Sequence, residues 1–516
     1  MPRQRSSIKN TTINLICGIG VLIINTLVSF FLSPFIIRTI GVEANGFVNL
    51  ANNFISYANI LVTALNAMAA RFVAISYTKG DYKKANLFYN SVFWGNLILV
   101  AVLMIPIGIL IGRLEHFFNV PDAILKDVKI LFGFAFLGFF ARTGAPNYDC
   151  GTYVKNRLDL SYIPHMVTTV LRAVLLFALF TFFMPHVWYV SLTSAIITIS
   201  LLFVSGHYTH VLTPELKIQI RKPLCDWKII WELVGSGIWS SIAIAGNTLM
   251  NGLDLLVCNL LIGATSMGVL SISKSLASIM STYAETIRGV FGPELTLAYA
   301  NDDKEALLAT VRRSMKITAV MVSIPAAGIF VMSKDMYRLW IPSQDAELLS
   351  VLTSLAILNY IFSSGIAVLN NVFVTVNKVR YNTYALVITG LTSIGITYLL
   401  VRFTGLGLYA VAGVSSVVMI IKNLTFMLPV TSKLLGYKWY QFFPQVGISI
   451  LCNAIIILIG IGVKHVLPVH SWLMFFAACL IIAVLGLFSN VMIVLSKQER
   501  KYLWSVAKRK FGRKSA

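Results

Sequence analysis

The chain alternates between long apolar stretches and short polar connections. Fourteen of the stretches are long enough to cross a bilayer as helices. We expect these spans near residues 13–37, 47–70, 88–112, 130–150, 162–183, 187–206, 229–256, 266–290, 314–333, 349–372, 383–401, 406–429, 443–463 and 471–495. No connection between them is long enough for a folded domain, so the pattern predicts an all-α polytopic membrane protein.

The stretch 268–292 differs from the others because polar side chains recur in it at helical spacing. Steps of three and four residues place them on one face of a helix: Ser271, Lys274, Ser278, Ser281, Glu285 and Arg288. Two cations and a carboxylate at membrane depth cannot face lipid. We therefore expect this set, the second polar face, to line a protein interior or a water-filled cavity that forms half of a substrate pathway.

An internal repeat relates the two halves of the chain. A shift of 222 residues without a gap aligns spans 1 and 2 with spans 7 and 8, and it places a polar residue opposite each member of the second polar face. This first polar face consists of Asn49, Asn52, Ser56, Asn59, Thr63 and Asn66. The shift corresponds to six helices, an even number, so the two copies have the same orientation in the membrane. We predict two six-helix lobes, residues 1–215 and 216–432, around a central cavity, followed by an extra helix pair, 433–496, and a basic cytoplasmic tail, 497–516.

Composition and charge agree with a membrane protein. The chain is 57% hydrophobic and 12% charged, with a mean hydropathy of +0.79. Its net charge is +22, and with the N-terminus inside, 31 of the 42 Lys and Arg residues fall in inner segments and 8 in outer connections. This distribution follows the positive-inside rule, predicts cytoplasmic N- and C-termini, and argues against nucleic acid as a partner. Arg172, Lys274 and Arg288 remain within spans.

The six cysteines show no CxxC spacing and no pair in outer loops. We therefore expect neither a disulfide nor a structural zinc site, and we expect no cofactor. Basic residues precede the first span, which has no small-residue cleavage site, so we expect an uncleaved first helix.

Several glycine-containing segments resemble those of one transporter family. The run Thr39–Phe47 (TIGVEANGF), the inner loop Tyr77–Tyr82 (YTKGDY), the turn Ile262–Gly268 (IGATSMG) and the segment Gly405–Tyr409 (GLGLY) are similar to Wzx-type polysaccharide flippases. These flippases belong to the multidrug/oligosaccharidyl-lipid/polysaccharide exporter (MOP) superfamily. The resemblance covers spans 1–12. Asn45 departs from it, because the family commonly has an aromatic residue there, and the extra helix pair is instead similar to lipid II flippases.

The resemblance implies a flippase of the bacterial cytoplasmic (inner) membrane. Its cargo is then an oligosaccharide on polyprenyl pyrophosphate, moved from the inner to the outer leaflet by alternating access for surface polysaccharide biosynthesis. The implied partners are membrane lipids and other polysaccharide-assembly proteins, and the implied state is a monomer without catalytic residues. Two alternatives stay open: multidrug or cation efflux by a relative in the superfamily, and a membrane-embedded polysaccharide polymerase or ligase. Cations in the expected cavity argue against the first, and short outer loops argue against the second.

A cargo of this kind needs cations for its pyrophosphate and neutral hydrogen-bonding groups for its sugars. Lys274 and Arg288 supply the cations, and the expected cavity also includes Ser281, Glu285, Asn52, Asn59, Asn66 and Arg172. The alternative interpretation is structural. Glu285 then pairs with Arg288, the asparagines join neighbouring helices, and Arg172 binds Asp149 or a backbone carbonyl.

A second candidate set lies in the seventh span. Asn247, Asn251 and Asp254 share one helix face. Asp254 is a candidate for binding a coupling H⁺ or Na⁺, because burial disfavours the charged form of a carboxyl group. The alternative is that Asp254 is a plain partner for Lys274.

Overall fold

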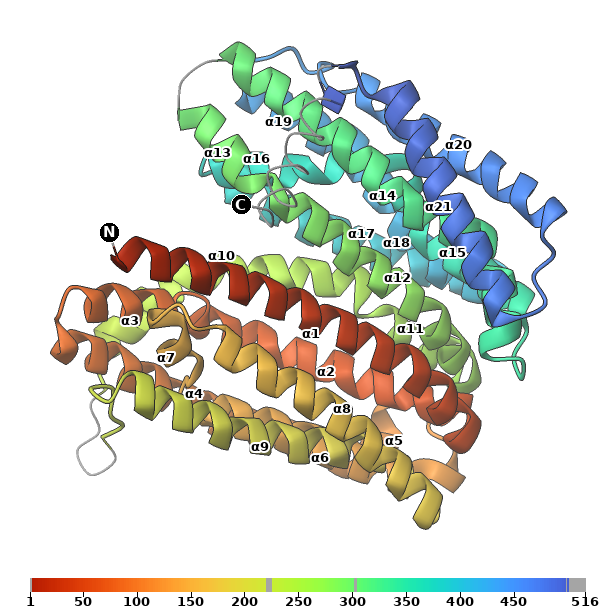
Figure 1. Cartoon of the computed structure of the whole chain (residues 1–516). Coiled ribbons are helices and arrows are strands. Elements are labelled where there is room, and N and C mark those ends of the chain that lie inside the picture. Colours follow the sequence, from red (N-terminus) through yellow and green to blue (C-terminus); the bar gives the residue numbers. More distant parts are fainter. Residues whose placement is uncertain (1, 220–224, 301–303, 498, 501–516) are drawn as a thin grey trace. The chain divides into compact units, whose positions relative to one another are not determined.

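A computed structural model describes residues 2–219, 225–300, 304–497 and 499–500, and it shows helices joined by short turns (Figure 1). No β-strand occurs in these ranges. The chain divides into two compact units. The first consists of Met1–Thr248 and Leu255–Gly268, and the second of Leu249–Asp254 and Val269–Ala516. Helix α12 (Ala264–Val290) therefore begins in the first unit and continues in the second.

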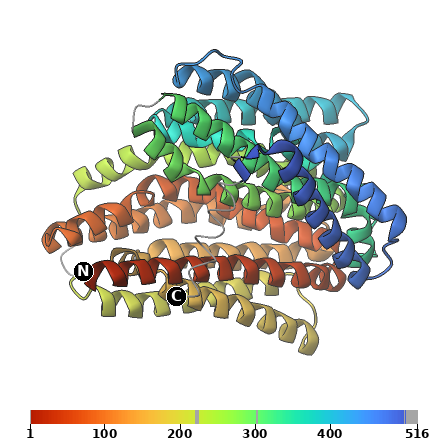
Figure 2. The same cartoon turned by 45° about the horizontal axis from the view of Figure 1, so that its top comes forward.

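The first unit contains the helices of the first repeat together with most of the seventh expected span. Its helices are α1 (Pro2–Ile40), α2 (Val42–Asn66), α3 (Ala69–Thr78), α4 (Tyr82–Gly112), α5 (Leu114–Phe117), α6 (Asp122–Gly144), α7 (Asp149–Val154), α8 (Asp159–Phe182), α9 (Tyr189–Leu212), most of α10 (Trp227–Asn251) and most of α11 (Asp254–Leu261). Figures 1 and 2 both show the dark red α1 alongside α8, and α6 packs in the same way against α9.

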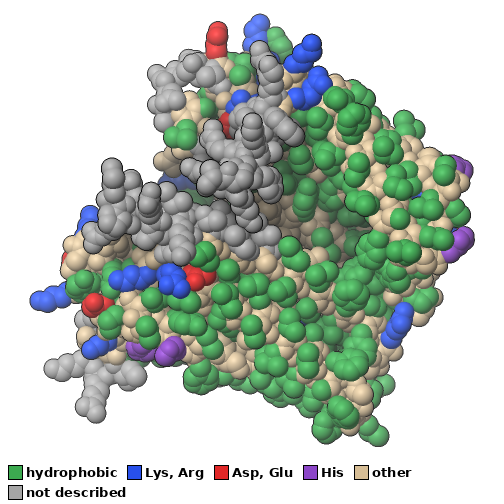
Figure 3. Space-filling model, in the orientation of Figure 1, with side chains coloured by type: hydrophobic (Ala, Val, Ile, Leu, Met, Phe, Trp, Pro, Cys, Tyr) green, Lys and Arg blue, Asp and Glu red, His purple; other side chains and the backbone are tan. Residues whose placement is uncertain are grey.

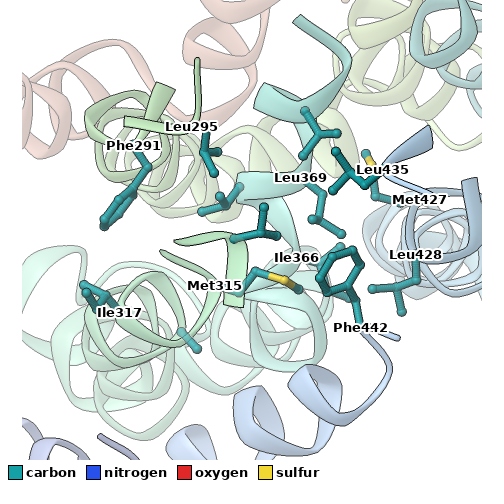
Figure 4. Packing of buried hydrophobic residues seen from close by; sticks show 14 of the residues in the cluster. Phe291, Leu295, Met315, Ile317, Ile366, Leu369, Met427, Leu428, Leu435 and Phe442 are labelled. Atoms are coloured by element: carbon teal, nitrogen blue, oxygen red, sulfur yellow. The ribbon is translucent and has the colours of Figure 1, made fainter. Parts of the chain in front are cut away.

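The second unit is built around one long helix, α14 (Lys304–Trp340). The other elements are α13 (Gly292–Ala300), α15 (Ala346–Ser363), the 3-10 helix η1 (Ile366–Leu369), α16 (Asn370–Thr375), α17 (Val379–Phe403), α18 (Gly407–Lys422), the π-helix η2 (Asn423–Met427), α19 (Leu428–Leu434), α20 (Pro444–Val466) and α21 (Trp472–Val494). Helix α14 packs against α15, α20 and α21. Figure 4 shows part of the buried core, where Met315 of α14 lies near Ile366 and Phe442. Cys452 of α20 belongs to the same core, so the extra helix pair is an integral part of this unit.

Each of the fourteen expected spans corresponds to a helix. Twelve segments of the described residues are long and apolar enough to cross a membrane, by length and composition. The other two expected spans are α6 and α12, which carry more charged and polar residues. At 1.5 Å per residue even the 23 residues of α6 extend about 35 Å, longer than the hydrocarbon core of a bilayer. Hydrophobic side chains cover much of the surface visible in Figure 3, as expected of a polytopic membrane protein.

The repeat predicted from the sequence is visible in the order of the elements. Helices α2 and α3 correspond to α12 and α13, α4 to α14, and α7 to α16. The two short helices α7 and α16 are each followed by an asparagine with left-handed backbone, Asn156 with φ 51° and Asn377 with φ 53°. In both, the amide of the next residue donates to a carbonyl of the short helix, at 2.8 and 2.7 Å. This is the hydrogen-bond pattern of a Schellman helix end, and it occurs at corresponding places in the two repeats.

Two spans end earlier than hydropathy predicted. The span expected at 130–150 ends at Gly144, because Pro146 lacks the N–H that a continuing helix needs. The span expected to reach residue 372 ends at Ser363, and the chain continues as η1 and α16. At that turn the amide of Gly365 donates to Ser449 Oγ (3.1 Å), and a methyl group on Gly365 would fall 2.7 Å from the carbonyl oxygen of Met315. The helix ends where the backbone closely approaches α14.

The start of α12 packs closely against α2 within the first unit. A methyl group on Gly46 would fall 2.9 Å from the Cα of Gly268, and one on Gly268 would overlap the carbonyl of Val42. Beside this crossing the hydroxyl of Thr265 donates to the carboxylate of Glu43. Thr265 and Glu43 are 222 residues apart and are thus equivalent positions of the repeat, as are the two glycines. Small residues permit such close helix crossings in membrane proteins.

The connection between α9 and α10 is bound along α4 by two asparagine side chains. The Asn86 amide donates to the carbonyl of Glu215 (2.6 Å) and accepts from the amide of Lys217 (2.8 Å). One helical turn later, Asn90 donates to the carbonyl of Lys217 (2.9 Å) and accepts from the amide of Gln219 (2.8 Å). The two side chains supply the backbone partners that a neighbouring β-strand would supply.

A tyrosine of α3 forms a hydrogen bond with the connection between α9 and α10. The hydroxyl of Tyr77 donates to the carboxylate of Glu215 (2.6 Å), and this hydrogen bond lowers the pKa of the Glu215 carboxyl. Ser91 of α4 also accepts from the amide of Asp226, at the start of α10 (3.1 Å). These contacts explain why α10 belongs to the first compact unit, although the repeat groups it with the second lobe. The lobe boundary at residue 215 stays a prediction from the repeat.

Candidate functional site

Helix α12 is held in the second unit by its apolar side. Met280 and Ala284 lie in a buried cluster with Val322 and Ala326 of α14 and Ile357 of α15. The second polar face occupies the remaining surface. Its members differ in burial: Ser271 is buried, Lys274, Ser281 and Arg288 are partly buried, and Ser278 and Glu285 are exposed. The helix therefore has the polar and apolar sides that its sequence predicted.

Lys274 has a carboxylate partner. Its ammonium group donates to the carboxylate of Asp254, and both side chains are largely buried. Asp254 begins α11 directly after the break that ends α10, and this break directs the carboxylate toward α12. The contact is the one expected if Asp254 is a plain partner for Lys274. It neutralises the ammonium, whereas a role of Asp254 in ion coupling stays a prediction.

Arg288 lies where α12, α15 and α16 meet. Its backbone carbonyl accepts a hydrogen bond from Asn371 Nδ2 of α16 (2.9 Å). Tyr360 of α15 is in hydrogen-bond contact with Ser281 and within electrostatic range of Glu285 and Arg288. Within the described ranges no ion pair joins Glu285 to Arg288, although the sequence suggested one as an alternative. Arg288 therefore places a guanidinium in this region without a carboxylate at ion-pair distance.

A further cation, which the sequence analysis did not place within a span, lies near Arg288. Lys422 is the last residue of α18, its exposure is only 7%, and Arg288 is its charged neighbour. The hydropathy pattern contained the necessary signal, because Lys422 falls inside the expected span 406–429. The charge count nevertheless assigned it to the inner connection. In the structure helical backbone continues beyond it through η2 and α19 to Leu434.

The first polar face has exposed and packed members. Asn52, Ser56 and Asn59 are exposed on α2. Asn66 instead pairs with the buried Asn96 of α4, and each side chain donates to the other's Oδ1, at 2.7 and 3.1 Å. This reciprocal amide pair joins the two helices in the way the structural alternative describes. Asn52 and Asn59 are thus the exposed amides of this face.

The remaining sequence candidates belong to the first unit or lie outside the description. Arg172 of α8 donates to Ser194 Oγ of α9 at 3.4 Å. Asp149, which the sequence suggested as its partner, instead pairs with Arg142 at 3.3 Å. Asn247 is exposed on α10, and the side chain of Asn251 lies outside the described residues. A coupling site formed by Asn247, Asn251 and Asp254 therefore stays a prediction.

The fold is that of the MOP-superfamily transporters. The chain superposes on the lipid II flippase MurJ, in an inward closed conformation, with a TM-score of 0.64 over 93% of this chain and 98% of that one, at 14% identity. A multidrug resistance MATE transporter in an inward-facing conformation gives a TM-score of 0.59 over 83% and 98%, at 16% identity. A MOP transporter from Pyrococcus furiosus, described as having a binding pocket of reverse polarity, gives 0.53 over 83% and 95%, at 16% identity. At these identities the similarity establishes the shared fold.

One curated protein is similar over nearly the whole chain. The uncharacterized membrane protein EpsK of Bacillus subtilis (strain 168) is 22% identical over 493 residues, which span 95% of this chain and 96% of that protein. No protein-family model matches the chain. The comparisons thus show a fold shared with solved MOP-superfamily transporters, while the Wzx type stays a prediction.

Proposed function

We propose that the protein is a flippase of the bacterial cytoplasmic membrane. Its cargo is an oligosaccharide linked to polyprenyl pyrophosphate, which it moves from the inner to the outer leaflet for surface polysaccharide biosynthesis. The observation that carries the proposal is Arg288, a guanidinium within an expected span that has no carboxylate at ion-pair distance among the described residues. An unpaired charge in a membrane interior is costly, and a phosphate-bearing cargo offsets that cost.

The neutral polar groups support a sugar-bearing cargo. Asn52, Ser56 and Asn59 are exposed on α2. Each asparagine amide offers both a donor and an acceptor, which suits the hydroxyl groups of a sugar. The first polar face then binds sugar, and Arg288 binds phosphate. We further propose transport by alternating access without a covalent step, coupled to H⁺ or Na⁺, by a monomer that works with other polysaccharide-assembly proteins.

Gene deletion with complementation tests this function. Deletion should make lipid-linked oligosaccharide accumulate on the cytoplasmic leaflet, measured as sugar accessible to periodate in inside-out vesicles but not in right-side-out vesicles. Arg288→Ala should fail to clear it, because the phosphate loses its guanidinium partner. Arg312→Ala, which removes an exposed arginine of α14, should clear it fully. A deletion strain without accumulation would exclude the flippase function, and full rescue by Arg288→Ala at normal expression would exclude the role of Arg288.

The exposed carboxylate of Glu285 is the observation that favours a second function, efflux of cationic drugs. Solved structures with this fold include multidrug resistance transporters. Arg288 and Lys422 lie in the same region as Glu285, so this region has two cations and one carboxylate. We therefore rank cation efflux second. A deletion strain that becomes sensitive to cationic dyes, with no change in its lipid-linked sugars, would reverse that ranking.

A further inference from the structure

Lys422 is buried at a position where its charge is not compensated. Its exposure is 7%, and in the part of the chain that the structure describes its ammonium has neither an ion pair nor a hydrogen bond. Moving an ammonium group out of water without a partner costs several kcal/mol in proteins, on the order of the stability of a whole domain. An anion bound by the protein would supply the negative charge that this position lacks.

The charged neighbour of Lys422 increases this cost. Arg288 acts on Lys422 electrostatically, and both residues belong to the second compact unit. Two positive groups repel each other, and at low dielectric the repulsion is stronger than in water. Neutral hydrogen-bonding side chains lie around the two cations: Tyr360 beside Arg288, and Asn423 and Asn359 beside Lys422. The exposed carboxylate of Glu285 also acts on Tyr360, but within the described ranges it forms no ion pair with Arg288. The arrangement is unfavourable when empty and favourable around an anion.

The helix geometry changes directly after Lys422, from an α-helix to a π-helix. The five residues Asn423–Met427 form a π-helix, which adds a residue to one turn and is frequent at functional sites. The buried Asn423 donates to Asn359 Oδ1 (3.2 Å), which fixes the turn on α15. Residue 360 of the same helix contacts the Arg288 region. Helix α15 therefore connects the segments that carry the two cations.

We propose that Arg288 and Lys422 form a pyrophosphate-binding site within the second unit. This proposal rests on the proposed function and specifies which residues bind the phosphates of its cargo. The guanidinium engages phosphate oxygens of one group through two parallel hydrogen bonds, and the ammonium acts on the adjacent group as a compact charge. Lys274 is not part of this site, because Asp254 neutralises it.

Binding to the purified full-length protein tests the site. Farnesyl diphosphate is the probe, titrated in detergent by microscale thermophoresis, with inorganic pyrophosphate and phosphatidylglycerol as competitors. Lys422→Met, which keeps the apolar stem, should weaken binding at least tenfold, about 1.4 kcal/mol. Lys422→Arg should stay within about threefold, because it retains the charge. Lys433→Met, on the exposed lysine of α19, should bind like the wild type.

Stability of the ligand-free protein is the second measurement. Lys422→Met removes a buried charge beside Arg288, so its thermal midpoint should equal or exceed that of the wild type. Farnesyl diphosphate should raise the midpoint of the wild type more than that of the variant. A midpoint of Lys422→Met well below the wild type would show that Lys422 has a structural partner, and this would overturn the proposal.

Two other outcomes would also overturn it. Unchanged affinity in Lys422→Met would remove Lys422 from the site, even if the deletion strain accumulates lipid-linked oligosaccharide. Competition by phosphatidylglycerol as strong as that by pyrophosphate would identify a site for bulk lipid headgroups. Lys422-dependent binding in a protein whose deletion causes no accumulation would instead retain the pyrophosphate site and reject the flippase function, so the two failures are distinguishable.

Discussion

Asp254→Asn is the sharpest test of the pairing within the second unit. The substitution keeps the shape of the side chain and removes its negative charge, which leaves the ammonium of Lys274 without compensation. The Lys274 and Asp254 side chains are 18% and 10% exposed, so water replaces little of the lost interaction. Removing one partner of a buried ion pair costs about 3–5 kcal/mol, and residual exposure favours the lower end, about 3 kcal/mol.

The measurement is the free energy of unfolding in mixed micelles, followed by tryptophan fluorescence. The double variant Asp254→Asn/Lys274→Met should recover all but about 1 kcal/mol, because an apolar replacement of a buried ion pair is close to neutral. The resulting coupling energy is therefore about 2 kcal/mol or more. The double variant should also retain transport, because in our proposal Arg288 and Lys422 bind the phosphates of the cargo.

Two results would refute this reasoning. Equal loss of stability in the single and the double variant would show that the ion pair is not the stabilising element. A double variant that is stable but does not transport would show that Asp254 or Lys274 takes part in ion coupling or cargo binding, as the sequence analysis also considered.

Two further perturbations test the packing and the inner connection. Gly268→Ala should cost about 1–3 kcal/mol of unfolding free energy, because its methyl group overlaps a carbonyl of α2. The control Gly108→Ala has open space around the added carbon and should be neutral or slightly stabilising. Equal effects of the two substitutions would contradict the close crossing of α2 and α12. The pKa of the Glu215 carboxyl is lowered in the folded protein. Its hydrogen bond with Tyr77 therefore stabilises the fold fully at a pH above about 4.3, the pKa of a free glutamate. This stabilisation is lost as the pH falls through the lowered pKa of Glu215. A spin label at Gln219 should therefore gain mobility only in acid, whereas in Tyr77→Phe it should be mobile already at neutral pH; identical pH profiles in the two proteins would contradict this role.

Sequence periodicity predicted the helices because a bilayer leaves a spanning segment few alternatives. Every backbone group in lipid must be bonded within its own segment, so a long apolar stretch is a helix. Helix ends depend on additional causes. Pro146 gave a visible signal for the end of α6, but the turn at Gly365 depends on Met315, fifty positions earlier, and on Ser449. Contacts of that kind have no local pattern.

The sequence predicted which helix faces form the candidate site. It did not predict which side chains of those faces pair with one another. Spacing identified both polar faces, since every member lies three or four residues from the next. It could not show that Asn66 faces Asn96, or that the break before Asp254 brings its carboxylate to Lys274. The sequence did not identify Lys422 as a site residue, because a cation near the end of an apolar stretch is normally assigned to the adjoining loop when charges are counted. Only the continuation of the helix beyond it reveals a buried position.

The contact between Glu43 and Thr265 joins two positions that are equivalent in the repeat. Between two separate copies of a half-length chain, such a contact is isologous: each residue meets its own counterpart, and every substitution appears on both sides. Fusion of the copies into one chain removes that constraint, so one side can be an acid and the other an alcohol. The same freedom extends to the two polar faces. A homodimer would have to carry charges on both faces or on neither, whereas the fused chain carries amides on the first and cations on the second.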